Sequence, residues 1–408
     1  MAALGPWEPA PCLAVAASGG ADSTALALLA HHWARARGGS VLALIVDHRL
    51  RPEAMAEAVA TRDLLVARGM AARILTLTDL PRGSALAERA RRARYRALAE
   101  ACAAAGIPHL LLGHHAGDQA ETVMIRTLGG SGSRGLAAMP ALVETGGLRL
   151  LRPLLTQPPA MLRRFLTAQG VPWIEDPSNA DRHALRGRLR ALRADHDGIG
   201  MGTVALVDAA TQAGHRRAMT EGRAARSLVE RVTIRPEGFA VLAPGAIDPD
   251  ALAAVLQAVA GAEYAPPLSA VADLARSPRP ATLAGARLLP AGRWGNGLLV
   301  VREEAAMGGA MPAAAGAVWD NRFRLAGPEM LPWGLTIAAL GDAAARVRRG
   351  SALPSAVLRT LPGLYRGNLL AAVPHLAYRD RTFCPDVRLV WQPPHPMGGA
   401  PFLPAGNA

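Results

Sequence analysis

Short apolar runs alternate with stretches of helix length between residues 11 and 128, and this alternation constrains the fold more than any other feature of the chain. Strands that alternate with helices form a parallel sheet covered by helices. The pattern predicts a doubly wound α/β domain, in which ligands bind beyond the carboxyl ends of the strands. The expected strands lie at 11–17, 40–46, 72–77 and 109–113, and the expected helices at 22–37, 52–69, 84–105 and 117–128.

The chain of 408 residues is too long for one ordinary domain. A Gly-rich interval at 198–202 and an Ala- and Gly-rich stretch at 303–318 have the composition of linkers. We therefore expect the α/β domain over 1–197, a helical middle domain over 203–302 and a small C-terminal domain over 318–408.

The basic charge of the chain comes entirely from arginine. The formal net charge is +13 and there is no lysine, which excludes a Walker A phosphate loop, Schiff-base chemistry and Ser-Lys hydrolysis. This charge favours an RNA partner, and because only 4% of residues are aromatic, RNA contact should depend on charge rather than on base stacking. We expect RNA contacts in the arginine run, at Arg182, Arg188, Arg190 and Arg193.

The cysteines and the hydropathy of the chain limit its chemistry and its location. Cys12, Cys102 and Cys384 lie far apart and form no C-x-x-C pair, which argues against a disulfide framework and a zinc site. No apolar run reaches the roughly 18 residues of a membrane span, and the N-terminus has no basic segment of a signal peptide. We expect a cytoplasmic protein without a membrane partner.

The first predicted strand ends in a loop suited to phosphate. Residues 18–23 read Ser-Gly-Gly-Ala-Asp-Ser and come directly before an Ala- and Leu-rich helix. The glycines permit a tight turn with exposed N–H groups, and the helix N-terminus adds partial positive charge. Ser18 and Ser23 can donate hydroxyl bonds, whereas Asp22 suits the magnesium ion that accompanies ATP. The alternative is that Asp22 and Ser23 only cap the helix.

The second predicted strand ends in Asp47 and His48, which we expect to contact ATP from the same edge of the sheet. An acid at this place also occurs in nicotinamide-binding Rossmann units, where it holds ribose. That interpretation fails because the loop at 18–23 does not match G-x-G-x-x-G.

The fourth predicted strand runs into a helix that begins with acidic residues. Asp118 and Glu121 are three positions apart, so they share one side of the helix near its positive end, where they could bind an ammonium group or a metal ion. Solvated acids at a helix start are the equally weighted alternative. The adjacent His114 and His115 cannot chelate a metal as an i, i+4 pair does, and we expect His114 to contact ATP.

Together these segments resemble the tRNA(Ile)-lysidine synthetases, a family of the N-type ATP pyrophosphatase (PP-loop) superfamily. The resemblance covers about the first 190 residues in the family's order, and WDNRFRL at 319–325 is similar to the C-terminal region of some members. The matching segments are SGGADS at 18–23, VDHRLR at 46–51, ARRARYRAL at 90–98, HHAGDQAET at 114–122, GGSGSRGLAAM at 129–139, RPLL at 152–155 and DPSN at 176–179.

The resemblance implies a ligase that uses ATP and Mg²⁺. ATP adenylates C2 of the wobble cytidine of an isoleucine tRNA, and free lysine then displaces AMP to give lysidine. By resemblance, Ser18, Gly19, Gly20, Asp22 and Ser23 hold the ATP phosphates and magnesium. The matching lysine-binding positions are Asp118, Glu121, Asn179 and Arg186, with Asp22, Asp118 and Glu121 as catalytic residues and Asp22 and Asp118 as metal ligands. The C-terminal domain is expected to bind tRNA, and the oligomeric state is left open, with a homodimer as one option.

The sequence departs from the family pattern at three places. Gly117 stands where members usually have an acid, Gly129 stands where they have arginine, and the usual RNRIR run contains Gly187. Two alternatives stay open: a tRNA thiolase of the same superfamily, which would normally use paired cysteines, and a catalytically divergent RNA-binding member.

Overall fold

The structure is a computed structural model that describes residues 1–49, 52–77, 86–145, 147–175, 185–328, 330–380, 386–399 and 401–406. The chain forms two compact units. Unit 1 is Met1–Met219 with Ala400–Ala408, and unit 2 is Thr220–Gly399. Among the described residues, no helix is long and apolar enough to cross a membrane.

Unit 1 contains the predicted parallel sheet. Its strand order is β3-β2-β1-β4-β6-β5, and every pairing is parallel except that of β5 with β6. The fold class predicted from the alternation is thus confirmed, whereas β6 and the antiparallel edge strand β5 were not foreseen. The strands are β1 Cys12–Ala16, β2 Ser40–Asp47, β3 Ala71–Thr76, β4 His109–Leu111, β5 Leu142–Thr145 and β6 Leu148–Leu151.

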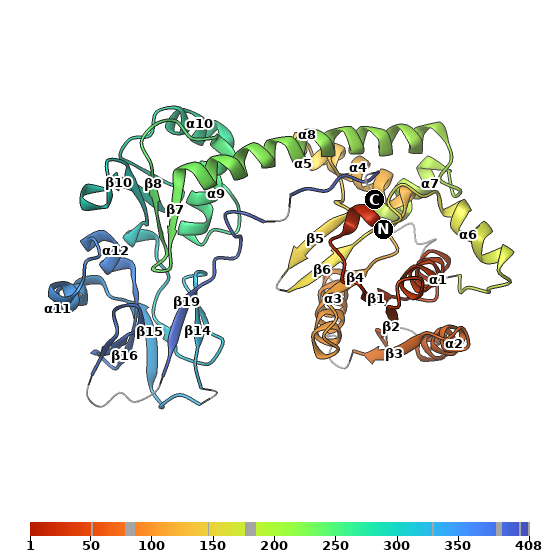
Figure 1. Cartoon of the computed structure of the whole chain (residues 1–408), viewed down its shortest axis with the longest axis horizontal. Coiled ribbons are helices and arrows are strands. Elements are labelled where there is room, and N and C mark those ends of the chain that lie inside the picture. The colour runs from red at the N-terminus through yellow and green to blue at the C-terminus, as the bar shows by residue number, and fades with distance from the viewer. Residues whose placement is uncertain are drawn as a thin grey trace. The chain divides into compact units, whose positions relative to one another are not determined.

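Helices cover both faces of this sheet, because successive strand residues point to opposite sides. Leu13 and Val15 of β1 pack with α1, α2 and α6, whereas Ala14 and Ala16 pack with α3 (Figure 1). The helices of unit 1 are η1 Ala2–Leu4, α1 Ala21–Arg35, α2 Ala54–Val66, α3 Leu86–Ala104, α4 Ala116–Leu128, α5 Ser133–Leu136, α6 Pro159–Ala168 and α7 Leu185–Arg193; α8, Met201–Arg231, continues into unit 2.

Unit 2 combines helices with antiparallel sheets. The segment 203–302, expected to be helical, contains α9, Pro249–Ala260. The carboxylate of Asp248 caps the start of this helix by accepting the Asp250 N–H at 2.9 Å, and Gly261, with φ 65°, ends it. The same segment also forms a sheet of order β7-β8-β11-β10-β9. Its elements are β7 Val232–Arg235, β8 Phe239–Leu242, α9 Pro249–Ala260, α10 Leu268–Arg276, β9 Ala281–Leu283, β10 Ala286–Pro290, η3 Gly292–Trp294 and β11 Leu298–Arg302.

The rest of unit 2 has two further antiparallel sheets, of order β12-β15-β16-β17-β18 and β13-β14-β19. Because 203–302 and 318–408 both lie largely in unit 2, their separation into two domains stays a prediction. The elements are η4 Glu304–Ala306, β12 Met311–Pro312, β13 Val318–Trp319, β14 Phe323–Ala326, β15 Leu335–Ala339, η5 Gly341–Ala343, α11 Ala344–Val347, η6 Arg348–Gly350, α12 Ser355–Thr360, β16 Pro362–Arg366, β17 Leu369–Val373, η7 Pro374–Leu376, β18 Tyr378–Arg379 and β19 Arg388–Trp391.

A buried charge network ties β11 to the β13–β14 turn. Asp320, 3% exposed, accepts from Arg322 Nε at 2.7 Å and from Arg302 Nη2 at 3.0 Å. Burial lowers the pKa of Arg322 to about 10, so the guanidinium stays charged at neutral pH.

We expect Asp320→Asn to destabilise unit 2 by on the order of 3–5 kcal/mol, because two buried arginines would lose their counter-charge. Asparagine tolerates the left-handed backbone of this residue (φ 50°), so the substitution isolates the charge. Denaturant unfolding measures the effect. Asp342→Asn is the matched control, since Asp342 is 97% exposed where it pairs with Arg359. Equal losses for the two variants would contradict the assignment.

Candidate active site

The loop between β1 and α1 is closed by its own serines. The Ser18 N–H donates to Ser23 Oγ at 3.0 Å, the two Oγ atoms lie 3.1 Å apart, and Ser23 Oγ donates to the Gly20 carbonyl at 3.1 Å. Ser23 is buried and Ser18 is exposed, so Ser23 fixes the turn while Ser18 faces outward. The loop leads directly into α1, and Asp22 lies in the first turn of this helix.

Two glycines allow this loop to meet its neighbours. Gly19 has φ 85°, and a Cβ there would lie 2.4 Å from Thr61 Oγ1 and 2.9 Å from Ile174 Cδ1. A Cβ on Gly113, just after β4, would lie 3.2 Å from the backbone nitrogen of Ser23. Glycine at position 19 therefore lets the loop lie against Thr61 and Ile174, and glycine at position 113 lets the end of β4 lie directly against the start of α1.

His115 connects the loop with the acidic start of α4. Its Nε2 lies 3.5 Å from Asp22 Oδ2 and 3.6 Å from Asp118 Oδ2. The ring is fixed from behind, since Nδ1 accepts the Gly117 N–H at 3.0 Å, and the His115 N–H donates to Asp118 Oδ2 at 3.0 Å. The structure thus brings the carboxylates of Asp22 and Asp118 together across one imidazole.

The two carboxylates have different electrostatic environments. Burial, together with the nearby Asp118 carboxylate, raises the pKa of Asp22. Burial also acts to raise the pKa of Asp118, but His115, His114 and the His115 N–H together hold it below its ordinary value. Opposite shifts in a close pair of acids are typical of functional sites.

Glu121 points toward α7 and is fully engaged there. Its side chain is 1% exposed, and Oε1 accepts from Arg190 Nε at 3.0 Å and lies 3.8 Å from Arg193 Nη2. Arg193 Nη1 also donates to the Gly117 carbonyl at 2.9 Å. Arg190 and Arg193 thus lie against α4, and the RNA contacts expected of them stay a prediction.

Arginines and histidines line the neighbouring strand ends. Burial lowers the pKa of His114 to about 4, assisted by the charges of Arg152 and Arg94, so this imidazole is neutral at physiological pH. Burial and Arg94 also lower the pKa of His48. Arg94 lies in the segment ARRARYRAL and Arg152 in the segment RPLL, and the sequence alone indicates no role for either residue. The helical phase of α3 was the missing information, because it decides which arginine of 89–96 faces inward.

Several buried polar atoms at this edge have no hydrogen-bond partner among the described residues. They are Asp22 Oδ1, Asp47 Oδ2, His48 Nδ1 and His114 Nδ1. Asp47 is 2% exposed and uses only its other oxygen, which accepts the Arg49 N–H at 2.9 Å. Buried polar atoms are normally satisfied, so these four are suited to a polar ligand.

The remaining predicted residues divide into two groups. Asn179 and Arg182 lie outside the described residues. Arg186 and Arg188 are exposed on α7, and the charge of Arg186 contributes to lowering the pKa of Asp118 and His114. Arg186 therefore lies within electrostatic reach of the acidic start of α4.

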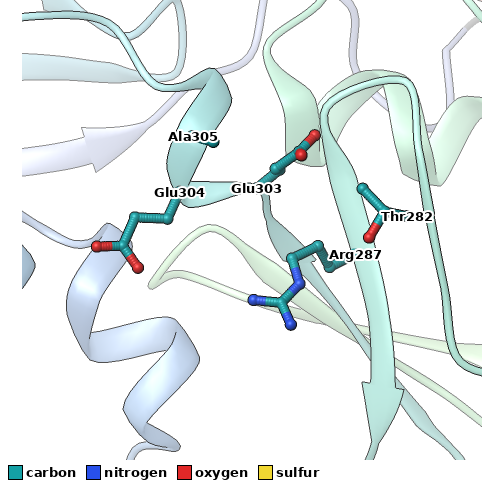
Figure 2. A pocket seen from close by; sticks show the side chains of 5 residues that line it. All are labelled: Thr282, Arg287, Glu303, Glu304 and Ala305. Atoms are coloured by element: carbon teal, nitrogen blue, oxygen red, sulfur yellow. The ribbon is translucent and has the colours of Figure 1, made fainter.

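Unit 2 contains an open pocket of about 530 Å³ (Figure 2). It is lined by Thr282, Arg287, Glu303, Glu304 and Ala305. Glu304 is already paired with Arg359 at 2.6 Å. None of the predicted site residues lines this pocket, and we assign it no function.

The arrangement in unit 1 defines the class of protein. A glycine-rich loop before a helix, facing carboxylates at the edge of a parallel sheet, is a nucleotide-phosphate site. In agreement, residues 2–194 match the family model of the PP-loop domain.

Comparison with curated proteins identifies the family. A tRNA(Ile)-lysidine synthase of Mesorhizobium japonicum is 38% identical over 81% of this chain and 76% of its own length. That of Ruegeria pomeroyi is 33% identical over 90% of this chain and 89% of its own. The chain therefore belongs to the tRNA(Ile)-lysidine synthase family. With other members the match is shorter. The tRNA(Ile)-lysidine synthase of Rhodopseudomonas palustris is 41% identical over 53% of this chain, and the match covers 63% of the length of that relative.

Proposed function

We propose that this chain ligates lysine to C2 of the wobble cytidine of an isoleucine tRNA with a CAU anticodon, through an adenylated tRNA intermediate. The observation that carries the proposal is that His115 lies between the phosphate loop and the first carboxylate of α4, with its Nε2 3.5 Å from Asp22 Oδ2 and 3.6 Å from Asp118 Oδ2. An ATP site and an acidic site for an amine thus share one edge of the sheet. That proximity suits two successive half-reactions on one tRNA base.

The first half-reaction needs the ATP phosphates to be held and their charge balanced. Ser18 and the loop N–H groups bind phosphate oxygens, and the neutral His114 together with Asp47 and His48 contacts the nucleotide. Asp22 and Asp118 suit Mg²⁺, which prefers one or two carboxylates plus phosphate oxygens. The buried Asp22 Oδ1, without a hydrogen bond among the described residues, fits such a ligand. When bound, the ion neutralises charge on the departing pyrophosphate.

The second half-reaction needs lysine to be oriented with a neutral amine toward C2. Asp118 can hold an ammonium group and Arg186 a carboxylate, and their charges already influence each other. Glu121 is paired with Arg190 of α7. We therefore propose that Glu121 holds α7 in place, and with it Arg186. Asn179 completes the predicted lysine site.

Neither of the two cysteines that the structure describes favours the thiolase alternative. Cys12 is exposed, and burial raises the pKa of the Cys102 thiol to about 11, the opposite of what a nucleophilic cysteine requires.

Incubation with ATP, tRNA and radiolabelled lysine tests the proposal. We expect label in the RNA together with AMP and pyrophosphate. A matched tRNA with uridine in place of the wobble cytidine should take up no label. ATP cleavage without label in RNA would overturn the lysine assignment, and the absence of tRNA-dependent ATP cleavage would favour the divergent RNA-binding alternative.

Binding of tRNA should depend steeply on salt, because a net charge of +13 displaces counterions from the RNA backbone. We expect affinity to fall by at least about 100-fold between 50 and 200 mM salt. Arg188→Gln should lower the slope of log K against log salt by about one. Arg62→Gln is the control, since Arg62 pairs with Asp63 at 2.8 Å. A flat salt dependence would mean that the arginines are neutralised internally.

A further inference from the structure

Gly117 is the residue of α4 on which the neighbouring groups converge. Its N–H donates to His115 Nδ1 at 3.0 Å, and its carbonyl accepts from Arg193 Nη1 at 2.9 Å. It is buried and lies in the first turn of α4. One residue thus links the histidine between the two carboxylates with an arginine of α7.

The space around Gly117 leaves no room for a side chain. A Cβ would lie 2.8 Å from His115 Cε1, 3.1 Å from His115 Nδ1 and 3.1 Å from Arg193 Nη2. Gly117 is not among the residues with positive φ, so the backbone does not demand glycine. Glycine is a weaker helix former than alanine, so the glycine here is explained by the packing of the two side chains.

This packing determines how His115 faces the carboxylates. Because Nδ1 accepts the Gly117 N–H, the proton of the neutral ring is on Nε2. That nitrogen lies between Asp22 and Asp118, at 3.5 Å and 3.6 Å. Any side chain at position 117 would push the ring out of this place or displace the guanidinium of Arg193.

We propose that Gly117 and Arg193 are positioning residues, which hold His115 with its Nε2–H between the carboxylates of the phosphate loop and of α4. An acid introduced at position 117 would therefore meet the His115 ring and the Arg193 guanidinium before it could serve as a further ligand. The inference rests on the proposed function only for its kinetic consequence, which is that the ATP half-reaction depends on this geometry.

The test combines a spectroscopic and a kinetic measurement on the full chain. The variants are Gly117→Ala, Gly117→Asp and Arg193→Met, with Gly202→Ala as the control, because a Cβ on the helical Gly202 meets nothing within 4 Å. Nitrogen-15 NMR of labelled histidines, with the His115 signals identified by their loss in His115→Gln, reports which ring nitrogen carries the proton.

We expect the wild type and Gly202→Ala to show the Nε2–H tautomer at His115 and the three variants to lose it. The KM for ATP should rise by about tenfold or more in Gly117→Ala, Gly117→Asp and Arg193→Met, the equivalent of one lost hydrogen bond, and should stay within about twofold in Gly202→Ala. Unchanged nitrogen signals in Gly117→Ala and Arg193→Met, or higher activity in Gly117→Asp, would overturn the proposal. If the wild type transfers no lysine, the proposed function fails, and the NMR comparison still decides the role of Gly117. Should Gly117→Ala not fold, Arg193→Met decides.

Discussion

Replacing Asp22 by alanine is expected to reduce tRNA-dependent AMP formation by at least about 100-fold, the usual scale for losing a group that stabilises developing charge. The reason is the position of its carboxylate, in the first turn of the helix behind the phosphate loop and 3.5 Å from His115 Nε2. Single-turnover formation of AMP and of adenylated tRNA, at saturating ATP, measures the loss.

Two further variants make the Asp22 result interpretable. Glu57→Ala removes an acid from the first turn of another helix, α2, and so matches the lost helix-dipole interaction. Ser18→Ala removes one neutral donor and should cost on the order of 1 kcal/mol, or several-fold in rate. Normal AMP formation by a folded Asp22→Ala protein would show that Asp22 only caps α1.

The first four strands of unit 1 were predictable because their mainly apolar runs alternate with stretches of helix length, whereas β5 and β6 follow one another without a helix between them. The runs at 40–46 and 72–77 correspond to β2, Ser40–Asp47, and β3, Ala71–Thr76. The short β7 and β8 of unit 2, four residues each, were missed because they lie among Ala-rich helices. A four-residue apolar run has no detectable period, so only the tertiary pairing identifies it as a strand.

The candidate site was predictable only where its chemistry is local in the chain. The phosphate loop is contiguous, so its glycines, serines and Asp22 could be recognised together. The Glu121–Arg190 pair joins residues 69 positions apart, and no spacing rule indicates it. Spacing did predict that Asp118 and Glu121 share a side of α4. It could not show that Glu121 turns toward α7, with a side chain 1% exposed against 15% for Asp118.

The Glu121–Arg190 pair provides the second large effect. We expect Glu121→Ala to raise the KM for lysine by about 100-fold, the scale of a few kcal/mol for a buried charge partner, and to leave the KM for ATP within about threefold. Adenylated tRNA should then accumulate. Graded lysine at saturating ATP, with both RNA products quantified in single turnovers, measures the two steps separately.

The Arg190→Met variant distinguishes the two ways in which Glu121 could act. If Glu121 positions α7 through Arg190, then Arg190→Met should raise the KM for lysine as Glu121→Ala does, and the double variant should be no worse than either single variant. If Glu121 binds the lysine ammonium directly, freeing its carboxylate should leave lysine use intact or improve it.

Arg190 also contributes positive charge beside the phosphate loop. Burial acts to lower the pKa of Arg190, but the bond to Glu121 and the charges of Asp118 and Asp22 raise it. If the KM for ATP rises in Arg190→Met but not in Glu121→Ala, then Arg190 serves the first half-reaction. In that case Glu121 does not act on lysine through Arg190.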